Sequence, residues 1–343
     1  MSEKRARVTI REVAQRAGVS QTTVSLVLNG KDASIPVPTR ERVREAAREL
    51  HYSTDPLARA LVTRRTNIVG IVVPDIANPF FAQAVRCMQV ALAERRYDVI
   101  LCNSEERFEN DLRYIRLLAG RSVDGLILTP SAEAFSPPES ARLRALLAQL
   151  DIPYIFFDRY FEDMPWAAVD NEGSAYLAAG ELLAHGHRVI GVVTGPLALN
   201  SSRNRLAGVR RALGEYGLIL PDDLIFEGRY DVETGQLGGE LLLKRGVSAV
   251  FAFSDMQACG VYASARRMGK RIPEDCSVIG FDDSFCSSVL DVPLSTMRQP
   301  VQEIASQACN MLLGRIGGGQ GISSFSLPAR LIARASVKNS ENA

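Results

Sequence analysis

The sequence lacks the features that mark membrane, secreted and metal-binding proteins. No apolar run approaches the roughly 20 residues that a helix needs to cross a bilayer. The first residues, MSEKR, are polar and charged where a signal peptide would carry its apolar segment. The six cysteines are scattered, without a C-x-x-C pair or the Cys/His spacing of a metal site. We therefore expect a cytoplasmic protein with reduced thiols, without membrane contact and without a bound metal.

Sequence motifs of common catalytic sites are missing as well. The chain has no G-x-S-x-G, no G-K-[ST] and no combination of carboxylates and histidine that indicates catalysis. A glycine cluster, GGGQG at 317–321, lacks the G-x-G-x-x-G spacing and does not lead from a strand into a helix. We interpret this cluster as a flexible loop between two lobes, and we expect neither catalytic residues nor a cofactor.

The charge of the chain is distributed unevenly, although its net value is only +1. Residues 1–65 hold 13 Lys and Arg against 7 Asp and Glu, whereas the remaining 278 residues hold 27 against 32. The N-terminal excess of positive charge suits contact with the phosphates of a nucleic acid. A solvated basic surface would give the same count, so the charge is supporting evidence only.

Residues 9–30 predict two short helices joined by a tight turn, which is a helix-turn-helix. Thr9 and Glu12 form a capping box that starts a helix at Ile10. Gly18 supplies the turn, and Ser20 can cap the second helix. The inward-facing positions are Val13, Ala14 and Ala17 in the first helix, and Val24, Val27 and Leu28 in the second.

The exposed start of the second helix carries short hydrogen-bonding side chains, which are Gln21, Thr22, Thr23 and Ser25. A DNA reader presents its base-contacting residues at this position. An ordinary pair of core helices is the alternative, but it gives these polar side chains no role. A third helix is predicted from a Thr39 cap to about Leu50.

A short basic helix is predicted from Pro56 to Leu61, behind Asp55. At under two turns it is too short to persist alone in water, so we interpret it as a segment that orders on binding. An ordinary linker is the alternative.

From residue 67 onward, apolar strands alternate with amphipathic helices, which predicts parallel sheets covered by helices on both faces. The strands are too many for one ordinary sheet, so we expect two α/β lobes of similar build. The expected domains are a headpiece at 1–50, a hinge at 51–66, a first lobe at 67–162 and 296–322, and a second lobe at 163–295 and 323–343.

Polar residues follow several of the expected strands, where open parallel sheets bind their ligands. These strand ends are Pro74-Asp75, Phe157-Asp158-Arg159, Gly195, Ser254-Asp255 and Phe281-Asp282-Asp283. With the aromatic residues Phe80, Phe81 and Tyr230 nearby, they suit a small polar or polyhydroxylated ligand. Each aspartate could instead cap a helix, and for Asp255 we weigh this alternative equally.

The order of motifs resembles the lactose-repressor (LacI) family of bacterial transcription regulators along nearly the whole chain. The matching segments are VAQRAGVSQTTVSLVLNG at 13–30, YSTDPLARAL at 52–61, VPDIANPFFA at 73–82, VDGLI at 123–127, HGHRVIG at 185–191, RLAGV at 205–209, VIGFDD at 278–283 and LSTMRQP at 294–300. The resemblance implies an all-α DNA-binding headpiece and a two-lobed α/β domain like the periplasmic binding proteins. It also implies a homodimeric repressor whose binding to double-stranded operator DNA is controlled by a small-molecule effector, with a sugar or sugar derivative expected. A secreted solute-binding protein of the same fold is the alternative, which the basic headpiece disfavours.

The resemblance also assigns DNA-binding roles. Gln21, Thr22 and Leu26 match positions that read bases, and Leu61 matches a hinge leucine that wedges into the minor groove. The phosphate-binding positions are Thr9, Ser20, Thr23, Ser25 and Asn29, and Arg59 would add positive charge at the hinge. The chain departs from the family pattern at Leu26, at Val62 and at Thr54-Asp55-Pro56, so no known operator can be transferred.

In the two-lobed domain, the resemblance implies that Arg205 and Asp282 grip the effector. Other positions expected in the cleft are Phe81, Asp158, Arg159, Ser201, Tyr230, Ser254, Asp255 and Gln299, to which the strand-end argument adds Asp75 and Phe80.

Overall fold

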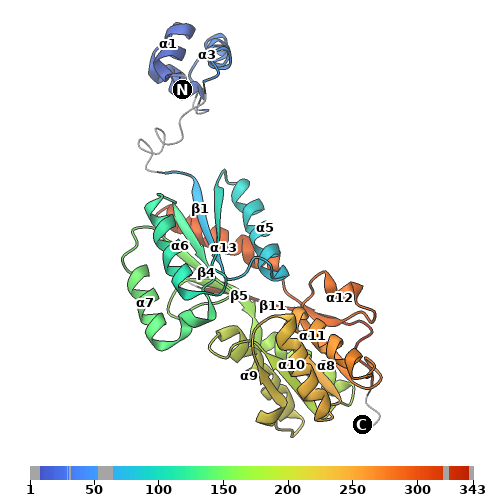
Figure 1. Ribbon diagram of the computed structural model, residues 1–343. Helices are drawn as coiled ribbons and strands as arrows, with labels where there is room; N and C mark the ends of the chain where they lie inside the picture. Colours follow the sequence, from blue (N-terminus) through green and yellow to red (C-terminus); the bar gives the residue numbers. More distant parts are fainter. Residues whose placement is uncertain (1–7, 29, 31, 53–64, 320–323, 340–343) are drawn as a thin grey trace, which may run out of the picture. The chain divides into compact units, whose positions relative to one another are not determined.

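The computed structural model describes residues 8–28, 30, 32–52, 65–319 and 324–339. The chain divides into two units, residues 1–66 and 67–343, which are treated separately below (Figure 1). Within the described residues, no helix has the length and apolar character needed to cross a membrane.

The first unit contains three helices, α1 Ile10–Ala17, α2 Gln21–Leu28 and α3 Val37–Glu49. The capping box is confirmed, because the Thr9 N–H and hydroxyl donate to Glu12 Oε2 at 2.6 and 2.8 Å. Gly18 adopts φ +66°, a conformation that suits glycine, and Ser20 Oγ accepts from Thr23 N at 3.1 Å.

The third helix begins two residues before the predicted Thr39 cap. Proline at the first helical turn needs no N–H partner, so Pro38 fits inside the helix. Thr39 N instead donates to the Pro36 carbonyl at 3.0 Å, as a first-turn residue. The small core of the unit consists of Val13, Ala14, Ala17, Val24, Val27, Val43, Ala46 and Ala47.

The second unit contains two six-stranded sheets, as the alternating pattern predicted (Figure 1). In spatial order the first is β11 Ser324–Pro328, β5 Trp166–Asp170, β4 Tyr154–Phe157, β3 Gly125–Leu128, β1 Ile68–Val73 and β2 Asp98–Asn103. The second is β12 Arg330–Ile332, β10 Ser295–Arg298, β9 Ser277–Asp282, β8 Ala249–Ala252, β6 Ile190–Thr194 and β7 Ile225–Glu227. The strand pairs are parallel except for β10 with β12.

Helices cover both faces of the first sheet. Alternate residues of its strands point to opposite sides, and the residues on both sides are apolar and need to be buried. Val69, Ile71 and Val73 pack in one cluster with α5 Pro79–Ala93 and α13 Val301–Ile316. Val72 packs in another with α6 Phe108–Gly120 and α7 Pro137–Leu147. The sequence analysis predicted neither α13 nor the strands β5, β7, β10, β11 and β12.

The helices of the second lobe pack in two pairs. One pair is α8 Asn171–Ala184 with α9 Asn200–Glu215, and the other is α10 Val232–Lys244 with α11 Asp255–Arg267. A short helix, α12 Cys286–Val289, follows β9. The short elements η1 Ala132–Phe135 and η2 Asp222–Leu224 complete the described helical segments.

The chain passes between the two lobes three times: from β5 to α8, from β10 to α13, and from β11 to β12. The strand assignments made from the sequence need correction here. β5 and β11 lie in the first sheet, although their residues were assigned to the second lobe, and most of β10 was assigned to the first lobe but lies in the second sheet. Pairings such as Ser324 with Trp166 join residues distant in sequence, and hydrophobic periodicity does not encode such pairings.

Candidate functional site

The second helix of the first unit presents a polar face. Gln21 and Thr22 are exposed, and Thr23, Ser25 and Leu26 are partly buried. Val24 and Val27 on the opposite face are buried in the core, which fixes the orientation of the helix. Thr9 and Ser20 are exposed at the starts of the two helices, while Asn29, Arg59 and Leu61 lie outside the described residues.

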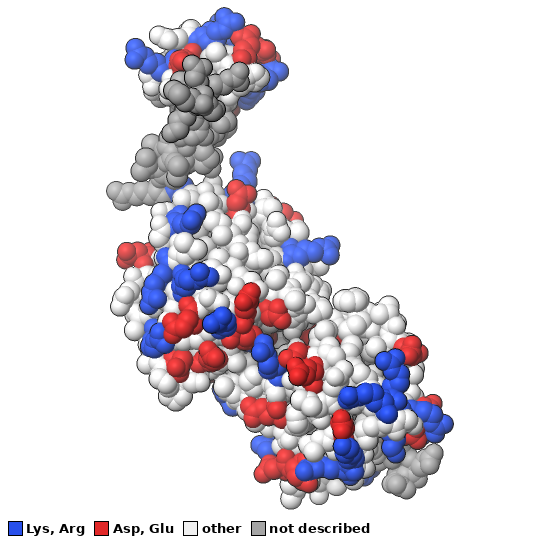
Figure 2. All heavy atoms as spheres, in the orientation of Figure 1, with Lys and Arg blue, Asp and Glu red and all other residues white. Residues whose placement is uncertain are grey.

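Part of the basic charge of this unit is neutralised by neighbouring carboxylates. Arg16 pairs with Glu49 at 2.7 Å and Arg44 pairs with Asp32 at 2.8 Å. Both arginine side chains remain at least half exposed, so these pairs are weak and can exchange for phosphates. Figure 2 shows acidic and basic side chains side by side on this unit and mixed signs on the visible face of residues 67–343.

In the second unit, the carboxyl ends of the strands of both sheets meet at a cleft. We call one part of it the inner pocket; its lining residues are Asn78, Phe80, Phe81, Asp158, Arg159, Ser201, Arg205, Tyr230, Ser254, Asp282 and Gln299. Ten of these residues were predicted from the sequence, and Asn78 is the addition. The cavity volume of this pocket is about 20 Å³, space for one or two water molecules, so the two walls almost touch.

Arg205 supplies positive charge to the inner pocket. Its Nε donates to Asn171 Oδ1 at 2.7 Å, and its Nη1 donates to the Phe253 carbonyl. The guanidinium also stacks on the Phe281 ring at 3.6 Å from the ring centroid. These contacts hold the buried side chain in one orientation, and Nη2 makes no hydrogen bond to the described residues.

Asp158 and Asp282 place carboxylates at the ends of β4 and β9. Both residues have positive φ, 64° and 122°, a costly backbone conformation that functional sites often retain. Burial raises the pKa of Asp158, while the charges of Arg205 and Arg159 oppose the rise. Burial likewise raises the pKa of Asp282 to about 7, against the opposing effects of Arg205 and a hydrogen bond from Gln299 Nε2 at 2.7 Å. The pocket thus sets two acids that resist full ionisation beside two arginines, Arg205 and Arg159.

Arg159 is held by a partner that the sequence analysis missed. Its Nη1 and Nη2 donate to Glu106 Oε2 and Oε1 at 3.0 and 2.7 Å, a bidentate pair. Nη1 also donates to the Pro130 carbonyl at 3.0 Å. The guanidinium charge is therefore matched within the wall of the first lobe. Glu106 follows β2 and could have been found by the same strand-end rule.

Aromatic rings form the apolar walls of the inner pocket. Phe80 packs edge-on against Phe81 at 5.1 Å and stacks with Phe157 at 6.1 Å. From the second lobe, Tyr230 is fixed by a 2.7 Å hydrogen bond between its hydroxyl and Ser202 Oγ. Gly195 leaves space for this ring, because a Cβ there would lie 2.3 Å from Tyr230 atoms.

A second, outer pocket adjoins the inner one. Asn78, Phe81, Arg159 and Tyr230 line both pockets, so the two form a continuous cleft. The outer pocket has a cavity volume of about 170 Å³. Asp75, predicted from its strand end, lines this outer pocket and not the inner one.

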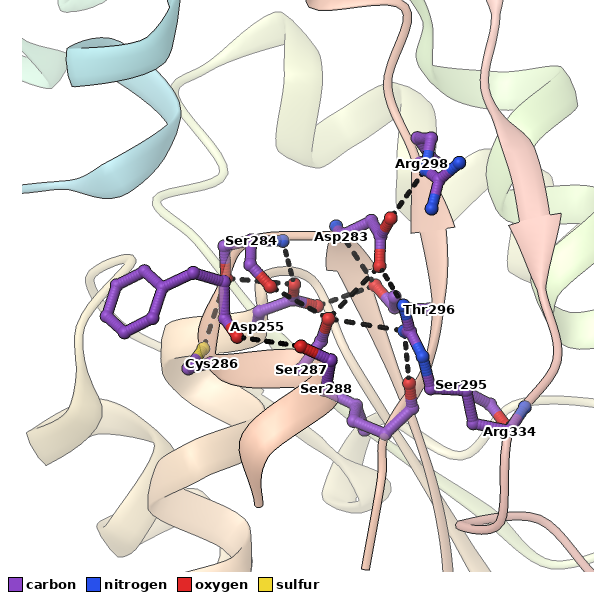
Figure 3. Close-up of polar contacts among 12 residues, drawn as sticks. Asp255, Asp283, Ser284, Cys286, Ser287, Ser288, Ser295, Thr296, Arg298 and Arg334 are labelled. Carbon is purple, nitrogen blue, oxygen red and sulfur yellow. Dashed lines mark hydrogen bonds and ion pairs between the residues drawn. The ribbon is translucent and has the colours of Figure 1, made fainter.

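Asp255 was predicted to contact the effector, but it lines neither pocket. It is fully buried, and its carboxylate accepts from Ser284 N at 2.7 Å, Ser284 Oγ at 3.0 Å and Thr296 Oγ1 at 2.6 Å (Figure 3). The helix-capping alternative is not realised either, since Ser254 is the N-cap and accepts from Gln257 N at 3.1 Å. Asp255 instead joins α11 to the loop after β9 and to β10.

Comparisons with known proteins agree with this arrangement. Residues 9–55 match the family described as bacterial regulatory proteins, lacI family, and residues 179–337 match a periplasmic binding protein-like domain. The ribose operon repressor of Halalkalibacterium halodurans is 31% identical over 338 residues, covering 97% of this chain and 98% of the repressor. The chain belongs to the LacI family.

Two solved LacI-family structures resemble the whole chain. The lac repressor dimer bound to operator and the anti-inducer ONPF has a TM-score of 0.85 at 26% identity, covering 97% of this chain and 100% of that one. A complex of the transcriptional regulator CelR with cellobiose has a TM-score of 0.72 at 31% identity, covering 96% and 100%. As a LacI-family member, this protein is a DNA-binding transcription regulator controlled by a small molecule.

Proposed function

We propose that the protein is a cytoplasmic homodimeric repressor that leaves its operator when an uncharged polar effector, a sugar or sugar derivative, binds in the inner pocket. The placement of Arg205 between Asp158 and Asp282 carries this proposal. A guanidinium can donate to hydroxyl oxygens and the aspartates can accept from hydroxyl hydrogens, so the set matches the alternating donors and acceptors of a sugar. The flanking rings of Phe80, Phe81 and Tyr230 suit its apolar faces.

Control of DNA binding follows from the near-closure of the inner pocket. A ligand must separate the two walls or rotate their side chains before it can enter a space that holds only one or two water molecules. Binding therefore favours a different arrangement of the two lobes. The coupling to the headpiece is reciprocal, and is typically about 1–3 kcal/mol in allosteric proteins.

In the headpiece, Gln21, Thr22 and Leu26 would read bases, because they occupy the face of α2 opposite its buried valines. Glutamine can pair with the adenine edge through two hydrogen bonds, and the threonine and leucine side chains can contact a thymine methyl. Thr9, Ser20, Thr23 and Ser25 would hold phosphates, and Asn29, Arg59 and Leu61 keep the DNA-binding roles proposed from the sequence. None of these roles requires a catalytic group.

The decisive experiment compares Arg205→Ala with Arg210→Ala. Arg210 lies on the same helix but is half exposed and pairs with Asp222 at 3.4 Å outside the pockets. Operator binding would be measured by fluorescence anisotropy, with and without an extract of cell metabolites. We expect the extract to release operator from the wild type and from Arg210→Ala but not from Arg205→Ala, which still binds DNA. Equal release from all three proteins would remove Arg205 from the effector site.

A further inference from the structure

The outer pocket lies at the open edge of the cleft. Ala132 and Arg159 of its lining follow β3 and β4, and the other lining residues follow β1, β2, β6 and β7. The latter four strands lie at one edge of each sheet, whereas the three crossings between the lobes lie near the opposite edges. The inner pocket also shares Asp282 and Gln299 with a cavity on the side of β9 and β10. The outer pocket is the continuation that residues of both lobes line through the ends of β1, β2, β6 and β7.

Polar groups from both lobes line the outer pocket. The first lobe contributes Asp75 and Glu106, and the second contributes Arg229 and Asp231. Arg229 is largely exposed and approaches Asp231 at 3.5 Å, a loose pair that leaves guanidinium donors for a ligand. Asp75 Oδ1 accepts from Ala77 N at 2.9 Å, and its lone pairs allow further bonds. Donors and acceptors therefore face each other across the opening.

Two further features favour an occupant that bridges both pockets. Phe81 and Tyr230 line both pockets, so an aromatic surface continues from one into the other. Arg159 also lines both, and its Nε is buried without a hydrogen-bond partner among the described residues. The two pockets therefore share an aromatic wall and a charged side chain.

The charge of the combined cleft disfavours anions. The inner pocket sets Asp158 and Asp282 against Arg205 and Arg159, and Arg159 also lines the outer pocket. The outer pocket sets Asp75, Glu106 and Asp231 against two arginines, one of which, Arg159, is already paired with Glu106. A phosphate or carboxylate would add negative charge beside aspartates whose pKa values are raised because burial already opposes their ionisation.

We propose that the outer pocket is a second subsite, and that the effector is an uncharged two-ring carbohydrate with one ring in each pocket. This inference rests on the proposed function, because it extends the same cleft. The proposed function names the effector only as a sugar or sugar derivative, whereas this inference specifies its size, two rings, and its charge, zero.

The test is titration calorimetry on the full chain. The probes are neutral disaccharides (cellobiose, maltose, lactose, sucrose, melibiose and trehalose), their component monosaccharides, and trehalose 6-phosphate and glucose 6-phosphate. We expect at least one neutral disaccharide to bind about tenfold or more tightly than either of its monosaccharides, and the phosphorylated sugars to bind more weakly than their neutral parents. A monosaccharide that binds equally well, or a phosphosugar that binds best, would overturn the inference.

Variants locate the second ring. Arg229→Ala should raise the dissociation constant of the disaccharide about fivefold or more and leave that of the monosaccharide within about twofold. Arg210→Ala, which removes an exposed arginine outside the cleft, should change neither. An equal loss for both sugars in Arg229→Ala would contradict a separate outer subsite.

The same titrations distinguish failure of this inference from failure of the proposed function. If no carbohydrate in the panel binds but another metabolite releases operator in an Arg205-dependent manner, the two-ring inference is wrong and the proposed function stands. If no small molecule affects operator binding, both are wrong.

Discussion

Asp282 lines the inner pocket, and its carboxylate lies in a buried neighbourhood that also holds Asp158. Its pKa of about 7 lies well above the usual 3.8, mainly because of burial. The folded protein therefore keeps a proton that the unfolded chain releases near pH 4. The free energy of unfolding should fall as the pH rises from about 4 to 7, and it should level off above 7.

Asp282→Asn should remove this contribution and keep the bond from Gln299, because asparagine retains Oδ1. The free energy of unfolding of the variant minus that of the wild type should increase by roughly 1–2 kcal/mol from pH 5 to pH 8. Each pKa unit corresponds to about 1.4 kcal/mol before solvent screening. Urea unfolding at several pH values measures the difference. A difference that does not change with pH would show that Asp282 titrates normally.

Asp255→Ala tests the structural role of the neighbouring aspartate. It would leave Ser284 N and Thr296 Oγ1 without their acceptor inside the protein, at a cost of about 1–3 kcal/mol in denaturant unfolding. Asp291→Ala, at an exposed position, is the matched control and should lie within about 0.5 kcal/mol of the wild type. Loss of effector binding at unchanged stability would return Asp255 to the ligand site.

At this scale the sequence predicted most of the cleft, because polar residues that follow parallel strands converge whatever their neighbours are. It could not predict that Asp255 faces away, since that direction depends on the loop at Ser284 and on Thr296, which lie far along the chain. Asn78 did carry a signal: an asparagine before Pro79 is an N-cap, and its side chain accepts from Phe80 N at 3.0 Å.

Two helices of the second lobe, α10 and α11, pack closely against each other. Gly260 on α11 lies so near α10 that a Cβ there would be 2.2 Å from the Val232 carbonyl oxygen. Gly214 on α9 has no atom within 4 Å of the corresponding position. The two glycines thus serve different purposes, although both lie in helices.

Gly260→Ala should therefore destabilise the protein by about 1–3 kcal/mol through overpacking. Gly214→Ala should stabilise it by about 0.5–1 kcal/mol, because alanine restricts the unfolded chain and favours the helix. Thermal unfolding of the two variants measures the contrast. Similar effects of both substitutions would mean that the α10–α11 contact adapts to a methyl group at little cost.

The sequence pattern predicts a strand at Tyr154–Phe157 and a helix at Ser174–Ala184. The structure has β4 at the same residues, and α8 begins three residues earlier than predicted. The missed elements have physical reasons. β7 and β12 are three residues long, and β11 alternates partly buried residues with exposed ones at the edge of a sheet. Helix α13 follows Pro300 and has an amphipathic face that the sequence analysis did not consider, although Val301, Ile304 and Ala305 are buried on it.

For the whole molecule, the segregation of charge predicts the salt dependence of DNA binding. Each phosphate contact adds about −0.9 to the slope of log affinity against log salt concentration, so operator affinity should fall steeply. Anisotropy titrations between low and physiological salt measure the slope. A flat dependence would contradict phosphate binding by the basic N-terminal unit.

The sequence also predicted two lobes and an N-terminal helical unit, because the number and alternation of the elements determine the class of fold. It did not predict which strands complete which sheet. Those pairings join segments that are distant along the chain, such as β11 with β5. They depend on tertiary contacts that a local sequence pattern does not specify.

The triple crossing between the lobes has a consequence for biosynthesis. The first sheet acquires its last strand at residues 324–328, after all but one strand of the second sheet have been made. During translation the nascent chain therefore exposes an unfinished edge along β5 until almost the entire protein has left the ribosome. A stop codon shortly before residue 324 would remove only a small part of the chain, yet it would leave both lobes incomplete.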